Sequence, residues 1–358
     1  MGFLQWLDEV ISHIRRKQAD HETIGKTIRE LPQTVDLSGE GALRRPMTKA
    51  GVQGKVGGVD SGFVSQSFYA MDLMLVRAMG VCFTYEQGKM VRAEYWPEHP
   101  GMPQPIVDTK GLEPDEFRRF VSLTRVRAEM DQARELIARC RPDVMFLDGS
   151  LILHPADKPG NESKLKEEYE IAIRSGVALY SAAEKANCLL IGAVEDSRST
   201  RLSEMLRKQY PHHPILGKQL GKELQDAPLM DKVLHAGERS IAFRVAEDIM
   251  KHPILMDYPS EWGARMHASY IKPSPWDYPL RIEFFSGKEG LTAAADAAAS
   301  QAFAQSSLHK EYAYPSVLIE ADMRAGLKPE EVDLVSDKIF SKIGRHTIHL
   351  RRRDRRPF

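Results

Sequence analysis

The chain has 358 residues, of which 42% are hydrophobic, enough for one large domain or two modest domains with a real core. Lys plus Arg and Asp plus Glu each number 50, so the formal net charge is zero. This balance excludes a bulk electrostatic attraction to nucleic acid or anionic lipid. Any polyanionic partner must therefore bind to a local patch.

The three cysteines, Cys82, Cys140 and Cys188, are far apart in the sequence and form no CxxC pair. This spacing disfavours a zinc site or a disulfide framework and predicts a reducing, cytoplasmic setting. No apolar run approaches the roughly 18 to 20 residues needed to span a bilayer. We therefore expect no membrane-embedded segment.

Residues 1–50 are expected to form an N-terminal segment of two short helices and a Gly/Pro-containing connector. The apolar residues of "MGFLQWLDEVISHIRRK" recur at helical spacing, and its charges follow the apolar part, the reverse of a signal peptide. This pattern predicts an amphipathic helix that packs on the body of the protein. A membrane-surface anchor is the alternative.

Strand-like runs begin at Gly54. The segments "VGGVDSGFVS", "MDLMLVRAMGVCFTY" and "KMVRAEYW" are separated by short breaks, so they predict an antiparallel meander, closed by the loop "PEHPGMPQP". A long helix is then predicted from Pro114 to Arg139. The buried strand "DVMFLDGS", a helix over residues 164–186 and the strand "CLLIGAVEDS" follow.

The later part of the chain has weaker signals. Residues 202–274 are irregular and proline-containing, which is typical of an insertion or lid. "YPLRIEFF" is the next expected strand, and "LTAAADAAASQAFAQSS" and "PEEVDLVSDKIFSKI" are the expected late helices. The expected organisation has four parts: an N-terminal helical segment (1–50), a core (51–201 and 275–345), an insertion (202–274) and a basic tail (346–358).

Three strands followed by alternating helices and strands predict a mixed α/β fold with a central sheet. This order resembles a ribonuclease H-like core, in which a mixed sheet is flanked by helices. A fold analogy of this kind carries no function by itself. The function has to be sought in particular side chains.

Two aspartates share one local context. "GVDSG" and "FLDGS" each place an acid, Asp60 or Asp148, after an apolar run and before small residues, at the end of an expected strand. On adjacent strands the two carboxylates would repel each other, and a divalent cation is the usual remedy. The alternative is that each aspartate caps a turn or helix through its side chain.

The long helix offers a third acid. If it runs antiparallel to the strand that ends at Asp148, a residue level with Asp148 lies about 12 to 13 positions before the turn, at about 1.5 Å per residue. This selects Glu129, which flanks the apolar stripe of the helix. The alternative is an exposed acid paired with Arg125 or Arg127.

The segment "YPSVLIEADMRAGL" carries Glu320 and Asp322 on a predicted short helix. Residues two apart on a helix do not face the same site, so only one of them can join the other acids. Asp322 is the candidate, although the sequence scarcely separates it from Glu320. Three or four carboxylates suit Mg²⁺ or Mn²⁺ rather than zinc, and two such ions are suited to phosphodiester hydrolysis. This is a nuclease site in outline.

Six segments in this order resemble the NurA nuclease family, the partners of the hexameric HerA ATPase: "GVDSGF", "FLDGSL", "GAVEDSRSTRL", "HAGERSIAF", "PLRIEFF" and "YPSVLIEADMRA". The resemblance implies a ribonuclease H-like fold and Mn²⁺-dependent cleavage of DNA. It also implies a homodimer that encloses a channel. The ATPase would dock on this dimer and feed duplex ends inward for resection in double-strand-break repair and homologous recombination.

By position, the resemblance implies that Asp60 and Asp148 are the two principal metal ligands, and that Glu129 and Asp322 are the remaining acids. The expected cofactor is Mn²⁺, in a two-metal site, with Mg²⁺ as an alternative. A basic phosphate contact is implied where this chain has Glu195. Either of two arginines could replace that contact, or both are merely solvated charges: Arg198 and Arg201.

The sequence therefore predicts a metal-dependent DNA nuclease, chiefly a 5′ to 3′ exonuclease with single-strand endonuclease activity. A catalytically weak clamp or adaptor that holds DNA for the ATPase is the alternative, and a ribonuclease H-like strand-transfer enzyme is a third possibility. No GxxxxGK[ST] motif appears, so the chain has no evident ATPase of its own. The tail "HLRRRDRRPF" is either solvated or in contact with DNA or the ATPase.

Overall fold

The computed structural model describes residues 2–31, 40–49, 51–68, 71–108, 110–219 and 224–343. The chain divides into two units. The first unit comprises Met1–Ala50, Ala193–Glu247 and Ala264–Tyr314, and the second comprises Gly51–Gly192, Asp248–Gly263 and Pro315–Phe358. The four-part organisation expected from the sequence stays a prediction, and the basic tail lies outside the described residues.

The second unit is built on the meander predicted from the sequence. Strands β2 (Gly54–Ser67), β3 (Asp72–Glu86) and β4 (Lys89–Trp96) pair in order and antiparallel. A further strand, β5 (Gln104–Asp108), pairs with β3 at its Asp72 end. The sequence did not reveal β5, because it begins inside the Pro-rich stretch that was expected to be a loop.

Strand β6 (Val144–Asp148) makes the sheet mixed. It runs parallel to β2, with Val56 opposite Val144 and Val59 opposite Leu147, and β7 (Leu189–Val194) lies next to it. The chain reaches β6 through α2 (Pro114–Cys140) and β7 through α3 (Lys166–Lys185). These bounds lie within two or three residues of the expected ones.

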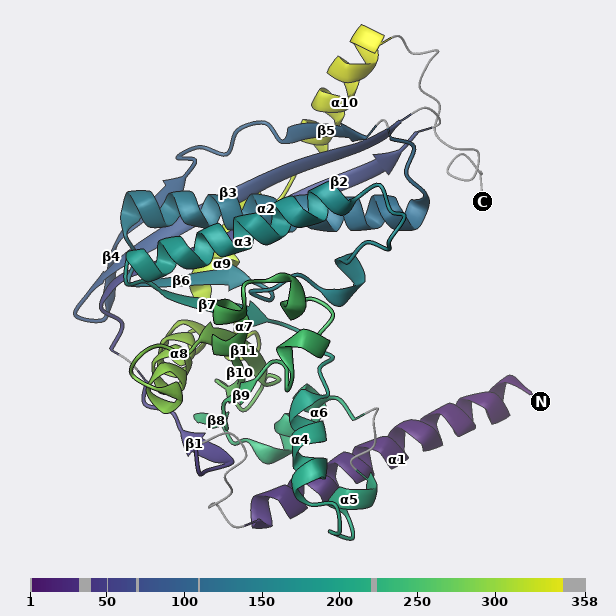
Figure 1. Cartoon of the computed structure of the whole chain (residues 1–358), viewed down its shortest axis with the longest axis vertical. Coiled ribbons are helices and arrows are strands. Elements are labelled where there is room, and N and C mark those ends of the chain that lie inside the picture. Colours follow the sequence, from purple (N-terminus) through teal and green to yellow (C-terminus); the bar gives the residue numbers. More distant parts are fainter. Residues whose placement is uncertain are drawn as a thin grey trace. The chain divides into compact units, whose positions relative to one another are not determined.

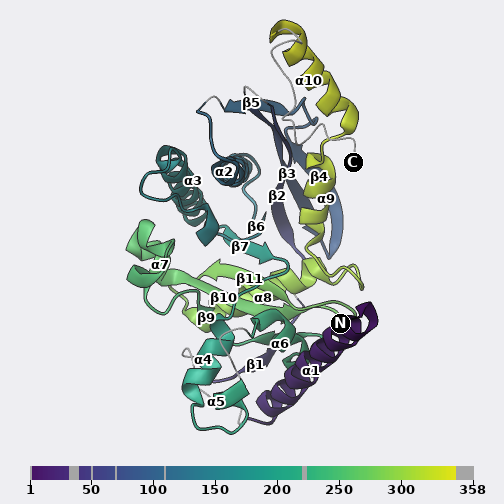
Figure 2. The ribbon, with the colours of Figure 1, turned by 90° about the vertical axis from the view of Figure 1, so that its right-hand side faces the viewer.

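Helices cover both faces of this sheet (Figure 1). Helices α2 and α3 lie on one face, and α9 (Ser316–Ala325) lies on the other, against β2 and β3 (Figure 2). The expected ribonuclease H-like arrangement, a mixed sheet flanked by helices, is therefore confirmed for this unit.

Helix α2 owes its bounds to local signals. Pro114 occupies its first turn, and Arg141 ends it in the left-handed conformation with φ of 48°. Its apolar residues near the start are buried within the unit. They pack with residues of β3: Phe117, Phe120 and Val121 with Met74 and Val76.

Two glycines of β2 allow α9 to approach closely. A Cβ atom on Gly58 would lie 2.9 Å from the side chain of Val317, and one on Gly62 would lie 2.2 Å from the carbonyl oxygen of Ala325. Contacts this short are not tolerated between non-bonded atoms, so larger residues would push the helix away. These glycines are therefore required for the packing of α9, not for flexibility.

Arg77 of β3 ties down the end of α9 and the start of α10 (Pro329–Ile343). It is buried, and it donates to the carbonyl oxygens of Ala325 and Gly326 and to both carboxylate oxygens of Glu331, at 2.9 and 3.0 Å. The pairing with Arg77 lowers the pKa of Glu331 to about 2. A bidentate pair of this kind fixes direction as well as distance.

The first unit contains one long helix where two short ones were expected. Helix α1 (Phe3–Glu30) is continuous, and a short strand, β1 (Arg44–Pro46), follows it. The C-terminal half of α1 packs into a core through Ile24 and Ile28, whereas the N-terminal segment that was expected to pack is largely exposed. Phe3 and Leu4, at the other end, are largely exposed.

The stretch expected to be irregular contains regular structure. Strand β10 is buried along its whole length and pairs antiparallel with β11, β8 and β9. Because all its side chains are buried, it lacks the alternation that identifies a half-exposed strand. The elements of this stretch are α4 (Arg201–Gln209), α5 (Leu216–Gln219), α6 (Asp226–Val233), β8 (Glu238–Ser240), β9 (Phe243–Arg244), α7 (Ser260–Arg265) and β10 (Met266–Lys272). The expected strand and helix that follow it are β11 (Leu280–Phe285) and α8 (Leu291–Ser306).

Short 3₁₀ turns over Pro155–Asp157, Ile249–Lys251 and Leu255–Asp257 complete the structure. Across the described ranges, none of the helices has the length and apolar character needed to cross a membrane.

The packing of α9 can be tested at Gly62. We expect Gly62→Ala to lower the free energy of unfolding by about 1–3 kcal/mol, the usual cost of overpacking, because the added methyl group meets backbone atoms that cannot rotate away. Urea denaturation followed by circular dichroism measures the change.

Gly101→Ala is the matched control, since a Cβ there has no atom within 4 Å. Equal stability of the Gly62 and Gly101 variants would contradict the close packing of α9 on β2.

Candidate active site

The two aspartates lie side by side, but only Asp148 ends a strand: Asp60, which was expected at a strand end, lies in the middle of β2, because β2 continues its pairing with β3. Asp148 is the last residue of β6, and the final pair of the parallel ladder is Val59 with Leu147, so Asp148 stands level with Asp60. Strand β2 continues to Ser67 beyond the end of β6. The pairing expected from the two similar segments is thus present in the structure.

Successive residues of β2 face opposite sides of the sheet. Gly58 and Gly62 face α9, so Asp60 between them also faces α9, whereas Ser61 faces α2. Asp60 is 5% exposed, and its Oδ1 accepts a hydrogen bond of 2.6 Å from the backbone N–H of Ser61. The glycines beside Asp60 therefore bring α9 over this carboxylate.

Glu129 reaches the strand end from α2. It is 5% exposed, and its Oε1 accepts a hydrogen bond of 2.5 Å from Ser61 Oγ and one of 2.8 Å from Arg125 Nη1. The helical arithmetic placed it correctly against the sheet. The alternative interpretation, an exposed acid paired with an arginine, correctly named Arg125 as a partner, but Glu129 is buried rather than exposed.

Asp322, rather than Glu320, is the acid of α9 that affects Asp60. Glu320 accepts a hydrogen bond of 2.7 Å from Arg324, and Arg324 in turn stacks on the ring of Tyr95 at 3.5 Å. Asp322 is exposed but close enough to Asp60 to raise its pKa. The structure thus separates two acids that the sequence could not.

The acids perturb one another. Burial and, after it, the carboxylates of Asp148, Glu129 and Asp322 together raise the pKa of Asp60 to about 8, against the hydrogen bond from Ser61, which lowers it. Burial also raises the pKa of Glu129 to about 7, although Arg125 and Ser61 oppose this shift. Perturbed carboxyl groups of this kind are frequent at functional sites.

The chemistry of these residues fits a hard divalent cation, which prefers carboxylate oxygens. In the ranges that the structure describes, no three His, Cys, Asp or Glu side chains are close enough together to hold a metal ion as they stand. The four acids are instead within electrostatic range of one another. Both hydrogen bonds of Glu129 to described residues use Oε1, which leaves Oε2 for a ligand.

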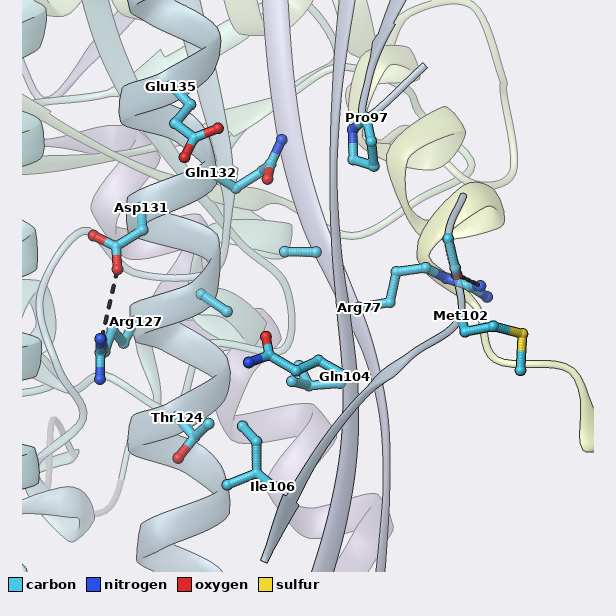
Figure 3. Close-up of a pocket in the computed structure, with 14 residues that line it drawn as sticks. Arg77, Pro97, Met102, Gln104, Ile106, Thr124, Arg127, Asp131, Gln132 and Glu135 are labelled. Atoms are coloured by element: carbon cyan, nitrogen blue, oxygen red, sulfur yellow. Dashed lines mark hydrogen bonds and ion pairs between the residues drawn. The ribbon is translucent and has the colours of Figure 1, made fainter. Parts of the chain in front are cut away.

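A groove of about 420 Å³ lies between α2 and the strands β3 and β5 (Figure 3). Arg127 lines it and pairs with Asp131 at 3.5 Å, so Arg127 is not the partner of Glu129. The groove wall also holds the side chains of Gln104 and Gln132 (Figure 3). None of the four acids lines this groove, so it is a separate feature of the second unit.

The residues proposed to contact phosphate lie in the first unit. Arg198 is exposed in the loop after β7, whereas Arg201 is engaged with Glu247 at 3.3 Å and with the carbonyl oxygen of Arg244. Glu195 accepts a hydrogen bond of 2.6 Å from Tyr312 Oη. A role for these arginines in binding DNA stays a prediction.

Sequence reasoning missed one residue of the site, Ser61. Its only signal was its place after Asp60 in a strand, where alternation turns it toward the helix that carries Glu129. Serine is common in turns and strands, so the residue type alone did not indicate that Ser61 belongs to the site. Its role depends on a contact between residues 68 positions apart.

Comparisons with known proteins agree with this architecture. A family model of the NurA domain matches residues 54–327. The crystal structure of the NurA nuclease from Sulfolobus solfataricus is 12% identical, with a TM-score of 0.58, and the match covers 96% of this chain and 98% of that one.

Weaker structural matches include NurA bound to dAMP and manganese, at 9% identity and a TM-score of 0.49, covering 92% of this chain and 94% of that one. An endonuclease V from Bacillus subtilis has 11% identity and a TM-score of 0.36, covering 84% and 87%. A search of curated protein sequences gives no match.

The mixed sheet flanked by helices has the ribonuclease H-like fold. The family match spans most of the chain, from the start of β2 to just beyond α9. The chain belongs to the NurA family of nucleases, as the sequence segments had indicated.

The raised pKa of Asp60 predicts that this residue reduces the stability of the metal-free protein. In the folded state its proton is held up to about pH 8, against about 3.8 for an ordinary aspartate, so stability falls as the pH rises from about 4 to about 8. We expect Asp60→Asn in EDTA to raise the free energy of unfolding by more than about 1 kcal/mol at pH 8. The gain should shrink toward pH 4.

Thermal and urea unfolding at several pH values measure this effect. Asp337→Asn, an exposed acid on α10, is the control and should change little. If Asp60→Asn gave no stabilisation at pH 8, the crowding of carboxylates around Asp60 would be refuted.

Proposed function

We propose that this protein is a metal-dependent DNA nuclease whose site is formed by Asp60, Glu129, Asp148 and Asp322. The proposal is supported by the level positions of Asp60 and Asp148 on paired parallel strands, and by the carboxylates of Glu129 on α2 and Asp322 on α9, which are near enough to Asp60 to raise its pKa. Membership of the NurA family supports the same activity.

Each acid has a distinct part in this proposal. Asp60 and Asp148, adjacent on parallel strands, would hold the metal from the sheet, and Asp322 would approach from α9. Glu129 would offer Oε2 while Oε1 stays bonded to Ser61 and Arg125. The bound ions, Mn²⁺ or alternatively Mg²⁺ in a two-metal site, supply the Lewis acidity and the activated nucleophile of phosphodiester hydrolysis.

Metal binding and proton release are linked in this site. Asp60 and Glu129 hold their protons near neutral pH because their environment disfavours two buried negative charges. Both carboxyl groups would have to lose their protons to hold a divalent cation, so metal affinity would increase with pH.

We further propose that the enzyme acts as a 5′ to 3′ exonuclease with single-strand endonuclease activity, in DNA end resection in the cytoplasm. It would work as a homodimer with a HerA-type hexameric ATPase. The resemblance of its sequence segments to the family supports this context. Arg198, exposed in the first unit, is the better candidate for a contact to DNA phosphate, because Arg201 already binds Glu247.

We expect the purified protein to degrade end-labelled linear DNA in Mn²⁺, and EDTA to stop the reaction. Asp60→Asn should reduce the rate at least about 100-fold, because the metal contributes several kcal/mol to the reaction. Gel analysis of labelled ends measures both the rate and the polarity.

Asp72→Asn, a buried acid at the far end of β3, is the matched control for changes to the fold. Equal products from Asp60→Asn and the wild type would contradict the proposal. Binding of DNA without any cleavage, even with the ATPase added, would favour the alternative of a DNA clamp or adaptor.

We also expect a particle of twice the 40.4 kDa chain mass, and a stable complex with a purified HerA-type hexamer that accelerates degradation of duplex ends. Light scattering after size-exclusion chromatography measures the mass of the particle and the formation of the complex, and the cleavage assay measures the acceleration. A monomer mass at all concentrations tested would contradict the homodimer, and separate elution of the two proteins would contradict the partnership.

A further inference from the structure

Ser61 connects the two sides of the candidate site. Its backbone N–H donates to Asp60 Oδ1 at 2.6 Å, and its hydroxyl donates to Glu129 Oε1 at 2.5 Å. Asp60 belongs to β2 and faces α9, whereas Glu129 extends from α2, on the opposite face of the sheet. Ser61 is 8% exposed, so its hydroxyl bond to Glu129 is largely shielded from water.

The hydrogen bonds to Glu129 are directional. Ser61 and Arg125 both donate to Oε1, and neither contacts Oε2. Because the carboxylate is planar, hydrogen bonds that hold Oε1 also restrict the position of Oε2. Groups that orient a ligand in this way commonly affect metal binding almost as strongly as the ligands themselves.

We propose that Ser61 is a positioning residue, whose hydroxyl holds Oε1 of Glu129 so that Oε2 is presented to the divalent cation. This inference rests on the proposed function, because it assumes that Glu129 contributes to a metal site. Ser61 acts through Glu129 alone.

Arg125 shares the same oxygen but has a second effect. Its positive charge lies near Asp60 and Asp148 as well as Glu129, so it opposes the binding of a cation even as it orients Glu129. Removing Arg125 would change both effects, in opposite directions. Ser61 is uncharged, so its replacement tests orientation alone.

The test is the affinity of the full chain for Mn²⁺ without DNA, measured by isothermal titration calorimetry on metal-stripped protein. We expect Ser61→Ala to weaken Mn²⁺ binding about 10- to 100-fold, the usual effect of losing a group that orients a ligand. Ser61→Thr, which keeps a hydroxyl, should recover most of the affinity. Ser65→Ala, an exposed serine of the same strand, should bind as the wild type does.

Cleavage assays over a range of Mn²⁺ add a second measurement. Ser61→Ala should need about 10- to 100-fold more Mn²⁺ for half-maximal rate but approach the wild-type rate at saturation. Circular dichroism and thermal unfolding establish that each variant is folded. A role in packing alone would change stability without this shift in metal dependence.

Three results distinguish the outcomes. Ser61→Ala with an Mn²⁺ affinity within about twofold of the wild type would overturn the positioning role while the nuclease proposal stands. Equal weakening by Ser61→Thr and Ser61→Ala would overturn it as well, because the hydroxyl would then not matter. A wild-type protein that binds no Mn²⁺ would overturn the proposed function, and this inference with it.

Discussion

The close approach of α9 to β2 is the constraint on which the site depends. Gly58 and Gly62 leave no room for a side chain between the strand and the helix, and Asp60 stands between them on the same face. A larger residue at either position would move α9, and with it Asp322, away from Asp60. The glycines and the acids of this segment are therefore parts of one arrangement, in which packing sets the distance between charges.

That arrangement opposes stability. Burial and neighbouring carboxylates raise the pKa of Asp60 and of Glu129, so the metal-free site stores repulsion that folding must overcome. Contacts elsewhere in the unit offset it: Arg77 ties α9 and α10 to β3, and the apolar face of α2 packs on the same strand. Enzymes commonly have such strained sites, whose loss increases stability and removes activity.

Much of this unit could be predicted because its signals are local. Strand-like apolar runs predict the strands of the meander, and helix-start and helix-end signals predict the bounds of α2. The apolar run before Asp148 and the small residues after it predict its position at a strand end. Even Glu129 could be selected, since the rise of a helix and that of a strand fix which residues lie at one level. The buried strand β10 escaped detection because burial on both faces erases the alternation that marks a strand.

The sequence by itself determined most elements of the second unit, the acidic residue types and the resemblance to the NurA family, because these depend on neighbouring residues and on their order. Only the tertiary structure decided that Asp322 rather than Glu320 approaches Asp60, and that Ser61 and Arg125 hold Glu129. The choice between Glu320 and Asp322 depends on how α9 is rotated against β2, which the glycine contacts set. The partners of Glu129 depend on how α2 crosses the sheet, and no local pattern in the chain records either geometry.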